Sequence, residues 1–163
     1  MRTDIFIKVL SEVRDPDLMD ADMESAFVLL RNFEARFSRF REGSELSLLN
    51  SSIGPCPVSD DLWGILGRCR EYFNETDGIF DPTVLPLLER EGYAASYGTD
   101  AFGRSEISLS EPKQCSFADV VLDAETRMVT RPSGCRIDLG GIGKGYVVDR
   151  VAELLGASYA DFI

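Results

Sequence analysis

The sequence contains no histidine at all. This absence excludes a Ser-His-Asp or Cys-His nucleophilic system and the usual imidazole zinc sites. Any chemistry must come from carboxylates, lysine, hydroxyl groups, backbone groups or a metal bound by oxygen. A hard cation such as magnesium would suit such ligands.

Cysteine is scarce and scattered. The four cysteines form no CxxC pair and no metal-finger spacing; they are Cys56, Cys69, Cys115 and Cys135. This spacing favours separate, small, buried apolar residues over metal ligands or a redox centre.

Long apolar runs and an excess of basic residues are also missing. No run approaches the roughly 20 residues that cross a bilayer, and the first residues lack the features of a signal peptide. Acidic residues outnumber basic ones by 28 to 17, and the net charge of -11 repels nucleic acid phosphates and anionic lipids. With 44% hydrophobic residues in 163 positions, the composition predicts a soluble domain with one core and no nucleic acid partner.

Three stretches show the spacing of apolar residues that is typical of one helix face. They cover residues 23–37, 62–73 and 147–155. Ser59 is the expected N-cap of the second stretch, because its hydroxyl can accept a hydrogen bond from the first turn.

Several shorter stretches have strand patterns. Alternation predicts a strand at residues 5–9, and a turn between residues 120–122 and 128–130 predicts a hairpin. Residues 135–139 suggest another short strand, and residues 158–163 resemble the start of a strand that has no partner. The expected fold is a single α+β domain over residues 1–163, in which the helices pack on a mostly antiparallel sheet.

The strongest candidate for a binding segment covers residues 137–149. Asp138 lies near the end of the predicted strand, a cluster of glycines comes next, and a helix then begins near Lys144. Glycines let the backbone approach a ligand, and a helix N-terminus offers N–H groups to a phosphate. The segment is neither a Walker A loop nor a GxGxxG fingerprint. The alternative is a flexible turn with Lys144 in a salt bridge.

Two further segments have both a structural and a functional interpretation. In residues 76–84, Asp81 either caps a helix that begins at Pro82 or, with the backbone around Phe80, binds a heteroaromatic ring. In residues 37–50, Ser44 starts another helix. Phe40 in that segment either packs inward or stays exposed for stacking.

Taken in order, the three segments resemble the signature motifs of the ApbE-like FAD:protein FMN transferases. The matching stretches are Phe-Ser-Arg-Phe-Arg-Glu-Gly-Ser-Glu, Thr-Asp-Gly-Ile-Phe-Asp-Pro-Thr-Val and Asp-Leu-Gly-Gly-Ile-Gly-Lys-Gly-Tyr-Val-Val-Asp. The resemblance implies that FAD is the substrate and that its pyrophosphate is split with Mg²⁺. FMN then passes to a threonine hydroxyl of an acceptor protein, and AMP is released.

The resemblance also assigns residues to the site, although it names no catalytic residue. The FAD contacts carried over from the motifs are Met1, Phe40, Ile79, Phe80, Asp81, Asp138 and Lys144. The backbone carbonyl of Gly141 matches a metal ligand. Phe40 replaces the commoner tyrosine, yet its ring can still stack.

Members of this family continue well beyond the last residue of this chain, and that later part carries an Asp and a Thr that bind the metal. We therefore expect a domain that is incomplete at its C-terminus, impaired transfer activity, and self-association through an exposed edge. Membrane attachment would require a lipoprotein anchor before Met1, so the compartment stays open. The alternatives are a non-catalytic flavin-binding module and an interaction remnant.

Overall fold

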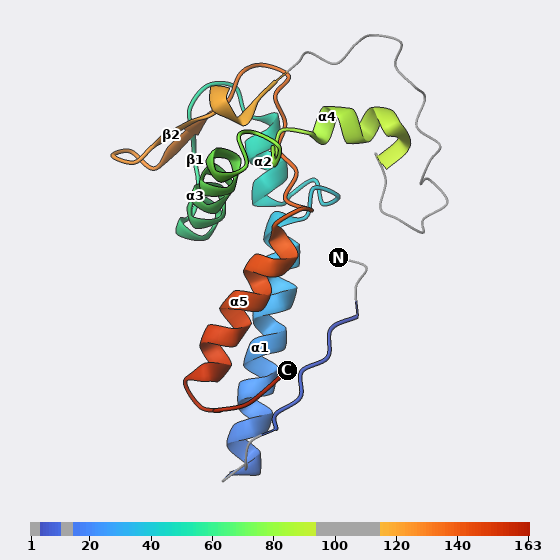
Figure 1. Ribbon diagram of the computed structural model, residues 1–163, viewed down its shortest axis with the longest axis vertical. Helices are drawn as coiled ribbons and strands as arrows, with labels where there is room; N and C mark the ends of the chain where they lie inside the picture. Colours follow the sequence, from blue (N-terminus) through green and yellow to red (C-terminus); the bar gives the residue numbers. More distant parts are fainter. Residues whose placement is uncertain (1–3, 11–14, 94–114) are drawn as a thin grey trace.

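The computed structural model describes residues 4–10, 15–93 and 115–163. The order of elements along these residues is shown in Figure 1. The helices are α1 (Pro16–Phe37), α2 (Glu45–Ser51), α3 (Asp60–Glu75), α4 (Leu85–Leu88), η1 (Glu89–Tyr93), η2 (Phe117–Asp119) and α5 (Gly143–Gly156). The strands are β1 (Cys56–Pro57), β2 (Val121–Asp123) and β3 (Met128–Thr130).

Helices α1 and α5 lie side by side and form the long lower half of the molecule (Figure 1). Their apolar faces share one core, which contains Ala26, Leu30, Val147, Val151 and Leu155. All three predicted helices are confirmed. α1 begins earlier than expected, at Pro16, because the Asp15 side chain accepts a hydrogen bond from the backbone N–H of Asp17 and caps the first turn.

A second core joins α2, α3 and the small sheet in the upper half of the molecule. The sheet has the order β1-β3-β2 and both pairings are antiparallel, so the predicted α+β class and hairpin are confirmed. Val129 of the central strand and Leu66 of α3 are completely buried in this core. The expectation that all three helices pack on the sheet is wrong for α1 and α5, whose apolar faces pack mainly on each other.

The first and last described segments pair with each other. The N–H of Lys8 donates to the carbonyl of Ile163 over 2.6 Å, and the N–H of Ile163 donates back over 2.8 Å. The expectation that residues 158–163 lack a partner is therefore wrong, and the predicted strand at residues 5–9 is reduced to one bridge between Val9 and Phe162. Self-association through the edge of this pair stays a prediction.

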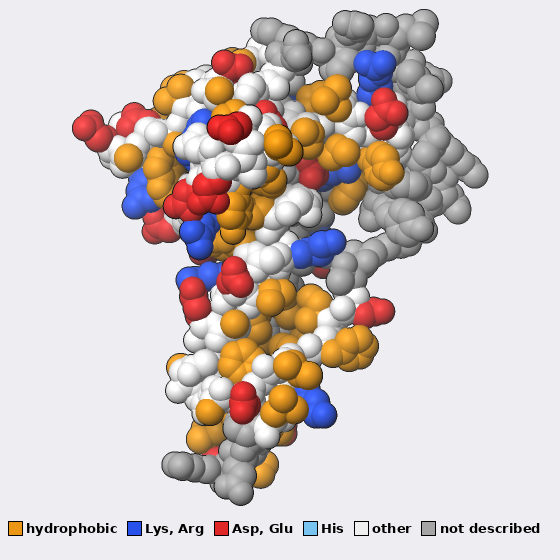
Figure 2. Space-filling view, viewed as in Figure 1, with side chains coloured by type: hydrophobic (Ala, Val, Ile, Leu, Met, Phe, Trp, Pro, Cys, Tyr) orange, Lys and Arg blue, Asp and Glu red, His pale blue; other side chains and the backbone are white. Residues whose placement is uncertain are grey.

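Hydrophobic side chains remain visible on the lower half of the molecule, among charged ones (Figure 2). Phe6 and Ile163 of the terminal pair are 86% and 73% exposed. None of the described helices combines the length and the apolar character that a bilayer span requires.

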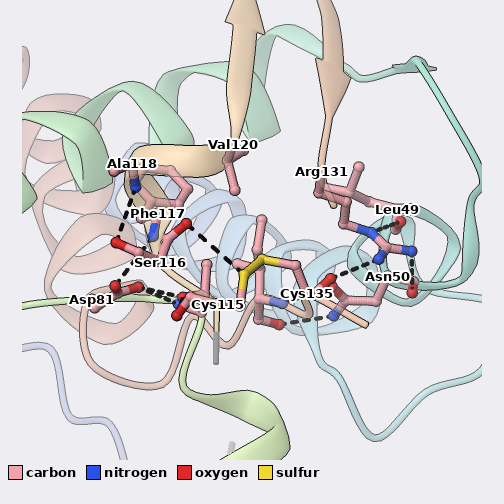
Figure 3. The surroundings of a disulfide bond; sticks show 12 residues. Leu49, Asn50, Asp81, Cys115, Ser116, Phe117, Ala118, Val120, Arg131 and Cys135 are labelled. Carbon is pink, nitrogen blue, oxygen red and sulfur yellow. Dashed lines mark hydrogen bonds between the residues drawn. A yellow bond between two sulfur atoms is a disulfide. The ribbon is translucent and has the colours of Figure 1, made fainter. Parts of the chain in front are cut away.

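Two of the cysteines form a disulfide bond, Cys115–Cys135 (Figure 3). The prediction of four separate thiols is wrong for this pair, because folding brings the two Cα atoms to 5.5 Å although they are 20 positions apart in the sequence. Cys56 and Cys69 are free. Burial raises the pKa of the Cys69 thiol to about 12, so this side chain stays protonated and unreactive at neutral pH.

The N-cap of α3 gives a direct test of the helix signals. The Ser59 hydroxyl accepts a hydrogen bond from the N–H of Leu62 over 3.2 Å, as the sequence predicts. Replacing Ser59 by alanine should lower the free energy of unfolding by about 1–2 kcal/mol. Urea denaturation measures the change. Ser25→Ala, on the exposed face of α1, is the control and should change stability by less than about 0.5 kcal/mol. Equal stability of the two variants would contradict the capping role.

Candidate functional site

The first segment runs from the end of α1 into α2. Its chain turns at Ser38 and then enters α2 through the Ser44 N-cap, whose hydroxyl accepts the N–H of Ser47 over 3.1 Å. The predicted helix start at Ser44 is confirmed. Phe40 lies in the turn with 46% of its surface exposed, so its ring is available for stacking and is not part of the core.

The C-terminal end of α2 is tied to the third segment. The Asn50 side chain accepts the N–H of Ile137 over 2.7 Å and donates to the carbonyl of Ile137 over 2.8 Å. Arg131 donates to the carbonyls of Leu49 and Cys135 over 2.9 and 2.6 Å (Figure 3). Partial burial lowers the pKa of Arg131 from its usual value, yet the side chain keeps its charge at neutral pH. These bonds fix the position of Ile137, the residue that directly precedes Asp138.

The second segment is a turn stabilised by Thr76 and Asp81. The N–H of Phe80 donates to the Thr76 hydroxyl over 2.9 Å. Asp77 and Gly78 adopt positive φ angles of 51° and 81° in this turn. Glycine suits such a conformation because it has no Cβ.

The carboxylate of Asp81 is already engaged within this region. One oxygen accepts the N–H of Thr83 over 2.8 Å, and the other accepts the N–H of Phe117 over 3.1 Å (Figure 3). The expectation that Asp81 caps a helix beginning at Pro82 is wrong: α4 begins at Leu85, and no side chain caps it.

The third segment runs beside the second. The N–H of Asp138 donates to the carbonyl of Pro82 over 2.8 Å, and Val84 forms a parallel bridge with Arg136. That bridge is the extent of the strand predicted at residues 135–139, because the Asn50 side chain takes the place of a neighbouring strand. The Asp138 carboxylate then accepts the N–H of Gly140 over 2.8 Å.

The glycine cluster lies against the second segment. A Cβ at Gly140 would come within 2.7 Å of the Asp138 carboxylate, so a larger residue there would require this carboxylate to shift. A Cβ at Gly141 would lie 3.4 Å from the Phe80 ring, which places that ring beside the turn. Helix α5 begins within the cluster, at Gly143, with no side-chain cap. Lys144 is exposed on its first turn.

The predicted site residues fall into connected groups. The Phe80 ring lies beside the turn at Gly141, and the N–H of Asp138 donates to the carbonyl of Pro82, next to Asp81. Ile79 is 90% exposed beside Phe80. Met1 lies outside the described residues. A cavity of about 190 Å³ opens beside Gly141 and is also lined by Arg68, Tyr72, Ile142, Gly145, Tyr146 and Asp149. Among the described residues, Gly141 is the only predicted site residue in this lining.

Magnesium is accommodated in proteins by oxygen ligands, commonly with one or two carboxylates. Gly141 offers only its backbone carbonyl. Over residues 4–10, 15–93 and 115–163, no three His, Cys, Asp or Glu side chains gather in a way that could hold an ion. Within these ranges, the Gly141 carbonyl is the ligand that the family motifs assign.

One residue in the middle of the site escaped the sequence reasoning. Arg39 pairs with Asp138, with 2.7 Å between the guanidinium Nε and the carboxylate Oδ2. Its guanidinium also lies 4.2 Å from the centroid of the Phe40 ring. The only signal in the sequence is that Arg39 directly precedes Phe40 inside a motif. The arginine thus connects the first and third segments.

The described residues form an α+β domain in which three motif segments come together. The sequence model of the ApbE family matches residues 1–161. This match covers nearly the whole chain, and the chain therefore belongs to the ApbE family.

Curated relatives carry one shared description. An FAD:protein FMN transferase from Treponema pallidum is 29% identical over 154 residues, which cover 86% of this chain and 41% of the relative. An FAD:protein FMN transferase from Haemophilus influenzae is 24% identical over 161 residues, which cover 95% of this chain and 46% of the relative. The chain thus spans less than half the length of these relatives.

Solved structures support the same fold. The ApbE protein from Thermotoga maritima superposes with a TM-score of 0.76 at 23% identity, over 93% of this chain and 50% of that protein. The apo form of the flavinyl transferase ApbE from Pseudomonas stutzeri gives a TM-score of 0.79 at 19% identity, over 96% of this chain and 52% of that protein. At these identities the likeness shows the fold.

Proposed function

We propose that this chain forms the FAD-binding part of an FAD:protein FMN transferase. The observation that carries the proposal is the convergence of the three motif segments. Asp138 is joined to the first segment through Arg39 and to the second through Pro82. Motifs that are far apart in the sequence thereby share one region, as a single ligand would require. The family membership and the names of the curated relatives support the same activity.

In the proposed reaction, FMN passes from FAD to a threonine hydroxyl of an acceptor protein. The pyrophosphate P–O bond breaks, a new P–O bond forms to the threonine oxygen, and AMP leaves with the bridging oxygen. The hydroxyl proton passes to a base or to water. Magnesium dependence belongs to the proposal on family grounds alone, and the ligand that the resemblance assigns to this chain is the Gly141 carbonyl.

The side chains of the chain bind and orient the substrate in this proposal. Phe40 stacks on the flavin or adenine ring with its exposed surface. Asp138 accepts a ligand hydrogen bond with the lone pairs that Arg39 and Gly140 leave available. Lys144, exposed at the first turn of α5, neutralises phosphate charge together with the N-terminal end of the helix dipole.

Replacing Phe40 by alanine should weaken FAD binding by about 10-fold, because stacking of a ring on an aromatic side chain contributes about 1–3 kcal/mol. Quenching of flavin fluorescence during titration of FAD with the protein measures the Kd. Phe6→Ala removes another exposed aromatic ring from the terminal pair and should leave the Kd within about 2-fold. Identical affinities of the two variants would remove Phe40 from the site.

A second candidate is a flavin-binding module without transferase activity. The three motif segments support binding of a flavin in either case, and the two functions differ in whether AMP is released. Chromatography for AMP after incubation with FAD and Mg²⁺ separates the two functions, with mass spectrometry of a threonine-bearing acceptor for the FMN adduct. Flavin quenching without AMP supports the module. AMP together with the adduct supports the transferase.

A further inference from the structure

The family motifs assign no role to Arg39. This residue lies between the Phe40 ring, a candidate for stacking, and the Asp138 carboxylate, a candidate for ligand binding. It pairs with Asp138 over 2.7 Å, and the two side chains are only 11% and 12% exposed. We propose that Arg39 is the positioning residue of the flavin site, which holds the Asp138 carboxylate and the Phe40 ring in a fixed relation. This inference rests on the proposed function.

The pairing with Asp138 determines how that carboxylate meets a ligand. Arg39 Nε occupies Oδ2, and the N–H of Gly140 occupies Oδ1. Both oxygens therefore have one donor each, which restricts rotation of the carboxylate and leaves their other lone pairs for a ligand. A pair so little exposed is weakly screened by solvent, so its geometry is well defined.

The same guanidinium defines the usable face of Phe40. It lies 4.2 Å from the ring centroid, and the ring is still 46% exposed. The arginine covers one side of the ring, so a heteroaromatic ligand ring would stack from the exposed side. Holding the ring in place before the ligand arrives reduces the entropy lost on binding.

A third contact anchors the arginine itself. Its Nη2 donates to the carbonyl of Tyr93, at the end of η1, over 2.7 Å. Arg39 thus combines a carboxylate, an aromatic ring and a carbonyl through one planar group. A lysine at this position would keep the charge. It has no planar group, however, that could bond the carboxylate and the carbonyl at once and stack on the ring.

The test compares Arg39→Met and Arg39→Lys with a matched control, Arg36→Met. Arg36 is in the last turn of α1, stacks on Phe37 at 4.8 Å and pairs with the carboxylates of Glu45 and Asp61, not with Asp138. We expect Arg39→Met to raise the Kd for FAD by about 30-fold and Arg39→Lys by about 10-fold. Arg36→Met should stay within about 2-fold.

A second measurement tests, without any ligand, whether Arg39 holds the Asp138 carboxylate in place. Exchange of the Gly140 amide, observed by NMR, reports its bond to the Asp138 carboxylate. We expect this exchange to be about 10-fold faster in Arg39→Met than in the wild type, and unchanged in Arg36→Met.

The outcomes separate the inference from the proposed function. Wild-type affinity for FAD in Arg39→Met, or equal losses in Arg39→Met and Arg36→Met, would overturn the positioning role. If the wild-type protein does not bind FAD, the proposed function fails. The Gly140 amide then decides about Arg39: faster exchange in Arg39→Met alone supports its hold on Asp138, and unchanged exchange refutes it.

Discussion

Asp138→Asn should raise the Kd for FAD by about 100-fold, the largest effect expected from a single atom exchange in this site. Asparagine keeps the shape of the side chain and can still accept the N–H of Gly140. It removes the negative charge that neutralises Arg39, however, and that pair is almost completely shielded from solvent. In the proposed site the ligand also loses its hydrogen bond to a charged group, which contributes about 1.5–3 kcal/mol, and about 2.7 kcal/mol corresponds to this change in Kd.

The measurement for Asp138→Asn is a fluorescence titration with FAD, below the unfolding temperature of each variant. Glu153→Gln is the matched control, because it removes the same charge from an exposed pair with Arg150 on α5. Its Kd should stay within about 2-fold of the wild type. An Asp138→Asn protein that binds FAD like the wild type would show that this carboxylate does not contact the ligand and that its charge is not needed.

Reduction of Cys115–Cys135 should lower the free energy of unfolding by about 3 kcal/mol. The bond closes a loop across 20 sequence positions, and a cross-link of this span limits the unfolded chain by about that amount. For a chain of this size the loss corresponds to about 6–12 °C in Tm. The bond also tethers Cys115, whose carbonyl accepts the Thr83 hydroxyl beside Asp81. Reduction should therefore weaken FAD binding as well.

Thermal unfolding with and without dithiothreitol tests the disulfide. Cys135→Ser should show the lower Tm under both conditions, while Cys56→Ser should respond to dithiothreitol like the wild type, because Cys56 is free. Thiol titration of the unreduced protein in denaturant should find Cys56 and Cys69 alone. Four reactive thiols in that titration would rule the bond out.

Asp81 differs from the exposed residues of the site in how readily it can contact a ligand. Asp81 is engaged within the fold, because its carboxylate accepts the N–H and hydroxyl of Thr83 and the N–H of Phe117. A direct contact between Asp81 and FAD is therefore harder to form than a contact with the exposed Ile79 or Phe40. Within the proposed function, the structure favours a role for Asp81 in shaping the turn that presents Phe80.

Local features of this protein could be read from its sequence alone. The apolar spacing in α1, α3 and α5 predicts helices because one face must be buried every three or four residues. The caps at Ser44 and Ser59 depend only on bonds within a few positions. The three binding motifs likewise identify the ApbE family without any knowledge of their positions in space.

Contacts between distant segments were decided only by the tertiary structure. The bond between Cys115 and Cys135, the pair of Arg39 with Asp138, and the pairing of Lys8 with Ile163 join residues whose spacing carries no signal. Asp81 illustrates the reason: locally it suits a helix cap, but folding brings the N–H of Phe117 to its carboxylate and leaves α4 to begin at Leu85. Periodicity determines which faces are buried, whereas the partner of each buried group depends on how the whole chain packs.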